Sequence, residues 1–301
     1  ISSFTSEERV AKASALAPVL RGFCSSHVQM VGHFSDDERV LQFINSNDLD
    51  RLAPLGTSCP DHFLRTKISP LVLGTDVSVE ALTPLFEEYR QMYAAYYDGC
   101  KHANSPTMRD PNPVVILYPG VGMFTFAKDK QTARVAAEFY TNAINVMRGA
   151  EAISSYTSLP RQEAFDIEYW LLEEAKLQRM PKPKALSGRV AFVTGSGGGI
   201  GKAIAKKMAQ EGACVILNDV NAERLAEAKA EFIGLFGKDV VSTVFADVTN
   251  QESIEVAMKQ ACLDFGGVDL IVNNAGISIS KGILEHTQGD WDKLYDILVK
   301  G

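Results

Sequence analysis

Four short apolar runs alternate with longer amphipathic segments in the second half of the chain. The apolar runs are typical of buried strands and cover residues 190–194, 215–219, 240–246 and 270–272. The segments between them have helical periodicity and cover residues 202–210, 221–236 and 249–265. This alternation predicts a parallel sheet with right-handed crossovers and helices on both faces. The expected fold class is therefore α/β, with a doubly wound parallel sheet in the C-terminal part.

Two of these helices begin at a residue suited to capping. Asn221 can accept a hydrogen bond from the first turn of the helix that ends at Phe236. Thr249 and Glu252 have the spacing of a capping box at the start of the helix that ends at Phe265. Both helices are thus expected to begin soon after the preceding strand.

The first half of the chain contains a strand followed by a long helix. The strand is predicted at residues 114–118, and Pro119-Gly-Val-Gly122 follows it. The helix is predicted at about residues 129–147, with a buried stripe at helical spacing that comprises Val135, Ala136, Phe139, Ala143 and Met147. We interpret this unit as strand, glycine turn and helix, with a tight turn that packs the helix on a sheet.

A proline-rich linker separates the two halves. A strongly helical segment, residues 163–179, runs into Met180-Pro-Lys-Pro-Lys184. Proline cannot continue a helix, so the segment must end there. We therefore expect one domain at residues 1–183 and a second at residues 184–301.

Composition and charge narrow the class of function. The chain has 301 residues, 46% of them hydrophobic, which suits two ordinary domains. A net charge of −7 without long runs argues against nucleic acid or an anionic membrane as a partner. No apolar run is long enough to span a membrane, and Glu7, Glu8 and Arg9 do not suit a signal peptide. Five irregularly spaced cysteines fit free thiols, so we expect a cytoplasmic protein.

The first strand of the second half leads into the glycine-rich turn Thr194-Gly-Ser-Gly-Gly-Gly199-Ile-Gly201. Glycines allow a pyrophosphate to approach the backbone, and the following helix points its N–H groups and positive dipole end at it. Asp219 ends the next strand, 18 residues after Gly201, where a carboxylate can bind ribose hydroxyls. The pattern predicts a Rossmann-type dinucleotide site. The alternative is a tight turn with a surface aspartate.

The choice of cofactor follows from charge around Asp219. A carboxylate accepts hydrogen bonds from a free 2′-hydroxyl and repels a 2′-phosphate. Val220 and Asn221 follow it and supply no cation, whereas Arg224 lies further on and suits a solvated helix face. We therefore expect NAD rather than NADP.

Three motifs in this half resemble those of the short-chain dehydrogenases/reductases. The turn resembles the TGxxxGIG sequence of that family, Asp247-Val248 closes the third strand, and Asn273-Asn-Ala-Gly276 closes the fourth. The resemblance covers residues 186–301. It implies that this set of residues binds the cofactor through pyrophosphate, ribose and adenine contacts: Thr194, Gly195, Ser196, Gly199, Ile200, Gly201, Asp219, Asp247, Val248, Asn274, Ala275 and Gly276.

The same resemblance implies that hydride transfer needs a Ser and a Tyr-x-x-x-Lys set. We expect these residues beyond Gly301, so the dehydrogenase domain is expected to be truncated and no catalytic residue is assigned. Leu298 stands where that family carries a catalytic asparagine. An apolar side chain cannot hold the water of a proton relay, so either the relay is built differently or catalysis is impaired.

The segment from Cys59 to Lys67 carries most of the reactive side chains of the first half. One interpretation is a sugar-phosphate contact, with Arg65 and Lys67 on phosphate and His62 as acid/base or metal ligand. The other is a turn with a hydrogen-bonded histidine and surface cations. A single His with one Cys does not make a zinc site, and no metal ligand is assigned.

Taken together, the segments resemble a bifunctional fusion of a class II, zinc-dependent aldolase with a short-chain dehydrogenase, of the rhamnulose-1-phosphate aldolase/lactaldehyde dehydrogenase type. The first-half motifs that carry this are Cys59-Pro-Asp-His62, Asp110-Pro-Asn-Pro113, Tyr118-Pro-Gly-Val-Gly-Met123 and Glu163-Ala-Phe-Asp-Ile-Glu-Tyr-Trp170. The resemblance implies cleavage of a ketose 1-phosphate and NAD-dependent oxidation of an aldehyde or alcohol. Its zinc ligands would precede Ile1, in the full-length aldolase module.

Two alternatives stay open. One is a sugar-alcohol phosphate dehydrogenase with a scaffold first domain, and the other is a non-catalytic NAD-binding subunit. In each case we expect a small-molecule partner, such as a sugar phosphate or aldehyde, no nucleic-acid or membrane partner, and a homo-oligomer.

Overall fold

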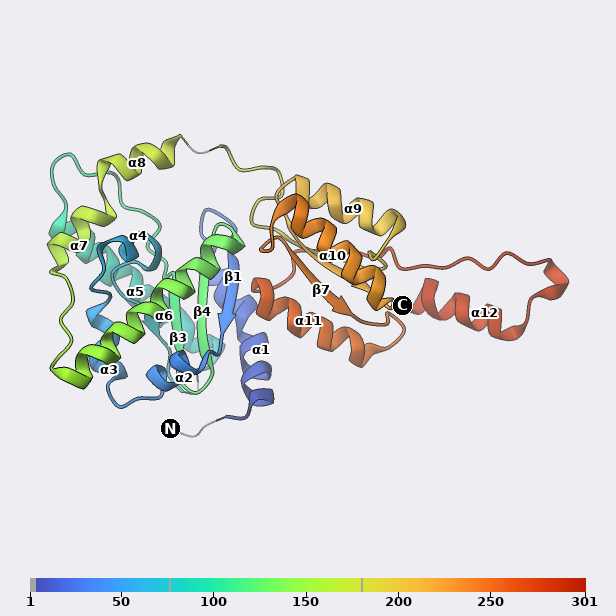
Figure 1. Ribbon diagram of the computed structural model, residues 1–301, viewed down its shortest axis with the longest axis horizontal. Coiled ribbons are helices and arrows are strands. Elements are labelled where there is room, and N and C mark those ends of the chain that lie inside the picture. Colours follow the sequence, from blue (N-terminus) through green and yellow to red (C-terminus); the bar gives the residue numbers. More distant parts are fainter. Residues whose placement is uncertain (1–3, 76, 180) are drawn as a thin grey trace. The chain divides into compact units, whose positions relative to one another are not determined.

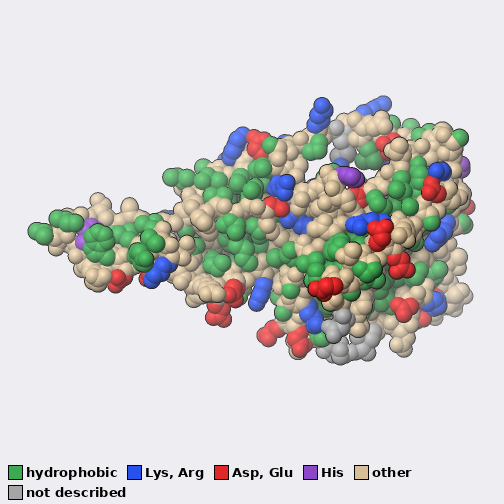
Figure 2. Space-filling view, turned by 180° about the vertical axis from the view of Figure 1, so that it is seen from behind, with side chains coloured by type: hydrophobic (Ala, Val, Ile, Leu, Met, Phe, Trp, Pro, Cys, Tyr) green, Lys and Arg blue, Asp and Glu red, His purple; other side chains and the backbone are tan. Residues whose placement is uncertain are grey.

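The computed structural model describes residues 4–75, 77–179 and 181–301. The chain divides into two compact units, with the boundary along the chain between Lys182 and Pro183, and each unit contains a four-stranded sheet (Figure 1). Met180, the first residue of the expected linker, lies outside the described residues. Charged side chains of both signs are interspersed on the face seen in Figure 2. Within the described residues, no helix has the length and apolarity needed to cross a membrane.

The sheet of the first unit has the order β1-β4-β3-β2. Its strands are β1 (Val31–Ser35), β2 (Leu71–Val72), β3 (Val115–Tyr118) and β4 (Gly122–Ala127). The pairs β1/β4 and β3/β4 are antiparallel, and β2/β3 is parallel. The helices are α1 (Ser6–Cys24), α2 (Glu38–Ile44), α3 (Leu49–Leu52), α4 (Phe63–Thr66), α5 (Val79–Cys100), α6 (Lys130–Ile153), α7 (Arg161–Glu168) and α8 (Leu171–Gln178).

The glycine segment after β3 forms a hairpin, which corrects the expected strand–turn–helix unit. Gly122 pairs with Tyr118, so the turn is tight and β4 returns alongside β3 before α6 begins. Gly120 has φ of +81°, a left-handed conformation that favours glycine. All six residues of β4 are buried, so the strand lacks the polar alternation that marks a half-exposed strand.

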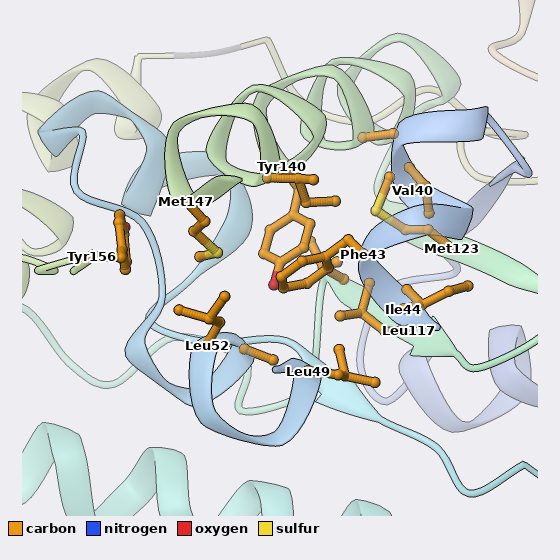
Figure 3. Packing of buried hydrophobic residues seen from close by; sticks show 14 residues of the cluster. Val40, Phe43, Ile44, Leu49, Leu52, Leu117, Met123, Tyr140, Met147 and Tyr156 are labelled. Atoms are coloured by element: carbon orange, nitrogen blue, oxygen red, sulfur yellow. The ribbon is translucent and has the colours of Figure 1, made fainter. Parts of the chain in front are cut away.

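Helix α6 covers the hydrophobic core of the first unit. Asp129 caps it by accepting a hydrogen bond from Thr132 N, and the helix continues past the predicted end to Ile153. Ala136, Ala143 and Met147 of the predicted stripe are buried, whereas Val135 and Phe139 are half-buried. Figure 3 shows the ring of Tyr140 close to Phe43 of α2, with Leu49 and Leu52 of α3 nearby. This hydrophobic cluster therefore lies between α6, α2, α3 and the sheet.

The helix predicted at residues 163–179 is two helices, α7 and α8. The break falls at Tyr169 and Trp170, where Trp170 takes an extended conformation. Tyr169 stacks on Phe165, and its hydroxyl lies 2.7 Å from the hydroxyl of Tyr93. These buried contacts hold Tyr169 at the end of α7, and tertiary structure thus overrides the helical pattern.

A buried polar cluster joins α4, α5, α7 and the loop before β3. Lys67 Nζ donates to the carbonyl oxygens of Asp110 and Asn112, the latter at 2.6 Å, and lies 4.3 Å from the ring centre of Tyr93. The carboxylate of Glu168, 1% exposed, accepts hydrogen bonds from Tyr93 at 2.6 Å and from Tyr96 at 3.2 Å. Burial lowers the pKa of Lys67 to about 8 and raises the pKa of Glu168.

The sheet of the second unit is parallel throughout, with the order β7-β6-β5-β8. Its strands are β5 (Val190–Val193), β6 (Cys214–Asp219), β7 (Val241–Phe245) and β8 (Leu270–Val272). Its helices are α9 (Gly199–Gln210), α10 (Ala222–Phe236), α11 (Gln251–Phe265) and α12 (Gln288–Tyr295), the last followed by a π-helical turn, Asp296–Lys300. The α/β class and the parallel sheet are confirmed.

Helix capping in the second unit agrees with one prediction and corrects another. Asn221 caps α10 by accepting from Arg224 N. Helix α11 is capped by Asn250, which accepts from Ser253 N, and not by Thr249. The Thr249 hydroxyl instead donates to the carboxylate of Asp247 at 2.8 Å. Asp247 also accepts from the N–H of Thr249, which is the pattern of an Asx turn just before the helix.

A Lys67→Met substitution tests the polar cluster through its dependence on pH. A lysine in an unfolded chain keeps its proton to about pH 10.4, whereas folded Lys67 releases it near pH 8. Between these values the unfolded state binds more protons, so the contribution of Lys67 to the free energy of unfolding rises with pH. The slope is at most about 1.4 kcal/mol per pH unit.

We therefore expect the free energy of unfolding of the native protein, minus that of Lys67→Met, to rise between about pH 8 and about pH 10.4. Urea titrations at several pH values measure this difference. Lys101 is the control, since it is exposed and its ion pair with Asp98 raises its pKa. The Lys101→Met variant should show a flat difference over the same range. A flat difference for Lys67→Met would contradict the burial of its ammonium group.

Candidate functional site

A cavity of the second unit lies at the carboxyl ends of its parallel strands. It has a volume of about 710 Å³ and is lined by the turns that follow β5, β6, β7 and β8. The chain passes outward from β5 to β6 and β7, then returns to β8 on the other side of β5. Open α/β sheets bind ligands at such a topological switch point. The location therefore favours a ligand site.

The glycine turn after β5 allows close approach of three backbone segments. A Cβ on Gly201 would lie 2.4 Å from Asn274 Nδ2 and 2.5 Å from the carbonyl oxygen of Gly195. A Cβ on Gly195 would lie 2.9 Å from Cα of Ala275, and Gly195 has φ of +61°. Only glycine fits these two positions without movement of the neighbouring backbone.

The start of α9, in contrast, faces open space. A Cβ on Gly198 or on Gly199 would meet no atom within 4 Å. The first N–H groups of a helix have no intrahelical acceptor, and they carry the positive end of its dipole. Gly198, Gly199 and Ile200 line the cavity at this point. A diphosphate group fits here, because backbone N–H groups and open space coincide.

Thr194 and Asn274 tie the ends of β5 and β8 together. The Thr194 hydroxyl oxygen accepts hydrogen bonds from the N–H groups of Asn274 and Ala275, both at 2.9 Å. The Asn274 amide donates to the carbonyl oxygens of Thr194 at 2.9 Å and Gly195 at 3.2 Å. Thr194 and Gly201 therefore shape the cavity without lining it, whereas Asn274, Ala275 and Gly276 form part of its wall.

Ser196 lies beneath the turn and not on the surface of the cavity. Its hydroxyl donates to the Val193 carbonyl at 2.7 Å, its N–H donates to the Asn218 carbonyl at 2.8 Å, and the side chain is fully buried. Asn218 in turn donates from its amide to the carbonyl of Ala246 at 2.9 Å. The structure thus gives Ser196 the role of joining β5 to β6, with no donor directed at a phosphate.

Asp219 is held in a fixed position at the end of β6. One carboxylate oxygen accepts from Gly197 N and the other from Asn221 N, both at 3.0 Å. Each oxygen keeps a further lone pair that can accept a hydrogen bond from a ribose hydroxyl. Arg224, which the sequence assigned to a solvated helix face, also lines this end of the cavity.

The remaining wall comes from the turn after β7 and from the C-terminal segment. Asp247 and Val248 line the cavity, and Asp247 accepts from both the N–H and the hydroxyl of Thr249. Lys293 and Ile297 line it as well, which sequence reasoning did not predict. These two residues belong to the C-terminal helical segment, whose sequence pattern is that of an ordinary surface helix. Such a pattern does not indicate that one face of the segment lies near turns that are distant in the sequence.

The three candidate residues of the first unit have separate environments. The ring of His62 is buried, with Nδ1 3.2 Å from the Thr57 hydroxyl and its edge against Phe139, and burial lowers its pKa. Arg65 is exposed, while Lys67 belongs to the buried polar cluster. These contacts favour a structural role for His62 and Lys67. Among the described residues, no three His, Cys, Asp or Glu side chains gather to hold a metal ion.

Comparison with protein-family models gives two matches that follow one another along the chain. Residues 11–177 match the second domain of class II aldolase, and residues 189–301 match short-chain dehydrogenase.

Among curated proteins, the uncharacterized oxidoreductase YuxG of Bacillus subtilis (strain 168) is 33% identical over 295 residues, which cover 96% of this chain and 43% of the relative. An uncharacterized oxidoreductase of Staphylococcus aureus (strain USA300) is 39% identical over 116 residues, which cover 38% of this chain and 48% of the relative. The chain thus spans less than half the length of either relative.

Solved structures also overlap with part of the chain. The 3-ketoacyl-(acyl-carrier-protein) reductase of Brucella melitensis, in complex with NADH, is 30% identical, covers 38% of this chain and 46% of its own, and has a TM-score of 0.36. The L-sorbose reductase of Gluconobacter frateurii, in complex with NADPH and L-sorbose, is 36% identical, covers 39% and 44%, and also has a TM-score of 0.36.

A Gly201→Ala substitution tests the close packing under the turn. The added methyl group would overlap Asn274 and the Gly195 carbonyl, so we expect a loss of roughly 1–3 kcal/mol in the free energy of unfolding. Gly198→Ala is the matched control, since its methyl group would meet open space and its backbone is extended. Urea unfolding of both variants measures the difference. Equal stability of the two variants would contradict the packing described here.

Proposed function

The chain belongs to the family in which the second domain of a class II aldolase is followed by a short-chain dehydrogenase domain, and on this premise we propose that its second unit binds NAD. In the whole protein, this domain would pass hydride to NAD from a small aldehyde or alcohol derived from sugar catabolism. The neighbouring module would cleave a ketose 1-phosphate. We place the whole protein in the cytoplasm as a homo-oligomer.

The observation that carries the proposal is the open start of α9 beneath the cavity. Gly198 and Gly199 leave room for a diphosphate, and the N–H groups there have no partner within the helix. Asp219 would accept hydrogen bonds from the adenosine ribose, while Asp247 and Val248 would border the adenine. Asn274, Ala275 and Gly276 would support the second ribose. A cavity of about 710 Å³ is within the usual range for a cofactor site.

The preference for NAD is supported by the charge next to the ribose position. Asp219 is held by two backbone N–H groups, and in the proposed site its carboxylate would face the 2′-phosphate of NADP. Arg224 lies on the same rim and would reduce the repulsion without removing it, because it belongs to the exposed start of α10. NAD supplies the hydride acceptor, and the residues of this chain bind and orient it.

A non-catalytic NAD-binding role is a second candidate, and one contact favours it. Leu298 Cδ2 lies 3.1 Å from the position that a Cβ on Gly276 would take, so an apolar side chain lies beside this residue of the cavity wall. An apolar side chain there cannot hold a relay water. Full-length protein that reduces NAD with small aldehydes, alcohols or alditol phosphates would favour the enzyme, and binding without turnover would favour the second candidate.

An Asp219→Ala substitution tests how the cofactor is held. Loss of the hydrogen bonds to the ribose should weaken NAD binding by about 10- to 100-fold, which corresponds to about 1.4–2.8 kcal/mol. NADP binding should stay constant or improve, since the repulsive charge is gone. Titration calorimetry with each dinucleotide measures both effects.

Glu223→Gln is the matched control for this experiment. Glu223 is exposed on the first turn of α10, close in sequence to Asp219, but it does not line the cavity. Its loss of one negative charge should leave both affinities unchanged. A native protein that binds NADP more tightly than NAD would overturn the proposed preference.

A further inference from the structure

A second cavity, in the first unit, has a lining unlike that of the dinucleotide site. It has a volume of about 390 Å³ and lies between the end of β1, the start of α2 and one face of α6. We call it the polar groove. Its residues are His33, Ser35, Asp37, Arg39, Arg134, Ala137, Glu138, Thr141, Asn142 and Asn145. All of these residues except Ala137 carry a polar side chain, so the groove can surround a ligand with hydrogen-bonding groups.

The charges of the polar groove cancel in pairs. Arg39 makes two hydrogen bonds to Asp37, at 2.8 and 2.9 Å, and Arg134 makes one to Glu138 at 2.5 Å. His33 Nδ1 lies 2.8 Å from Lys130 Nζ. Because an ammonium group can only donate, Nδ1 must be the acceptor, and the proton of the neutral ring is on Nε2. The charged side chains of the lining thus sum to zero, while the ammonium group of Lys130 lies against His33.

One acceptor in the polar groove has no protein donor. The side-chain oxygen of Asn145 is buried and makes no hydrogen bond within the described residues. Leaving such a group without a partner costs roughly 1–3 kcal/mol. Asn142, three residues earlier on α6, lies at the exposed rim. Both residues line the groove, so a ligand that enters it would lie beside both side chains.

From these features we infer that the polar groove binds an uncharged polyhydroxy compound, such as a monosaccharide or an alditol. A hydroxyl group both donates and accepts, which suits a lining that alternates carboxylate and amide oxygens with guanidinium and amide N–H groups. Among the residues that the structure describes, the lining contains no Phe, Tyr or Trp side chain. The volume is within the range for small ligands. The inference is independent of the dinucleotide site, which lies in the other unit.

The test is binding of D-ribose, D-glucose, sorbitol and inorganic phosphate to the full chain, measured by ligand-observed NMR and titration calorimetry. We expect at least one of the neutral polyols to bind saturably with a dissociation constant in the millimolar range or below, and phosphate to bind more weakly. Phosphate binding tighter than that of every polyol, or no saturable polyol binding, would overturn the inference.

Two variants locate the site. Asn145→Leu removes the buried acceptor, and we expect it to weaken polyol binding at least about tenfold, equivalent to about 1.4 kcal/mol. Asn47→Leu makes the same change at an exposed position of the first unit and should leave binding unchanged. Glu138→Gln, at an exposed side chain, provides a second test if Asn145→Leu does not fold, and it should also weaken binding. Unchanged polyol affinity in the folded groove variants would place the ligand elsewhere and refute the inference.

Discussion

The hydrogen bonds between Thr194 and Asn274 determine the shape of the dinucleotide site. Four bonds in two directions hold the end of β5 against the end of β8, and they leave no space for side chains at Gly195 and Gly201. The Thr194 hydroxyl and the Asn274 amide are thus engaged within the protein, whereas the first backbone N–H groups of α9 have no acceptor within their own helix. The proposed phosphate site is therefore at the start of α9, next to the junction that these hydrogen bonds hold together.

Much of the second unit could be predicted from its sequence, since local pattern and tertiary structure agree there. Strands β5 and β6 bury apolar runs, and Asn221 caps its own helix. The first unit was harder to predict. Strand β4 is buried on both faces and has no alternation, and the break between α7 and α8 depends on contacts of Tyr169 with the distant Tyr93. Such contacts leave no trace in a local window of sequence.

The part of the candidate site that could be predicted from the sequence is the part that depends on local pattern. Motif glycines and Asp219 are adjacent to the strands that position them, so spacing along the chain identifies the turns. Spacing does not tell which side of a turn a residue occupies, and Ser196 lies on the buried side. Lys293 and Ile297 reach the cavity only because the C-terminal segment folds back toward the turns after β7 and β8.

The polar groups around the two cavities are satisfied in different ways, and this difference bears on where ligands can bind. The second unit pairs side chains such as Asn218 and Asn274 with backbone carbonyls, which leaves backbone N–H groups of α9 as the available donors. Around the polar groove of the first unit, ion pairs join side chains to one another, and the buried side-chain oxygen of Asn145 has no hydrogen-bond partner among the described residues. Unpaired donors with a positive dipole suit an anionic phosphate, whereas a lone neutral acceptor between balanced charges suits a hydroxyl group. The difference in hydrogen bonding therefore favours a phosphate-bearing ligand in the cavity of the second unit and a hydroxyl-bearing ligand in the polar groove.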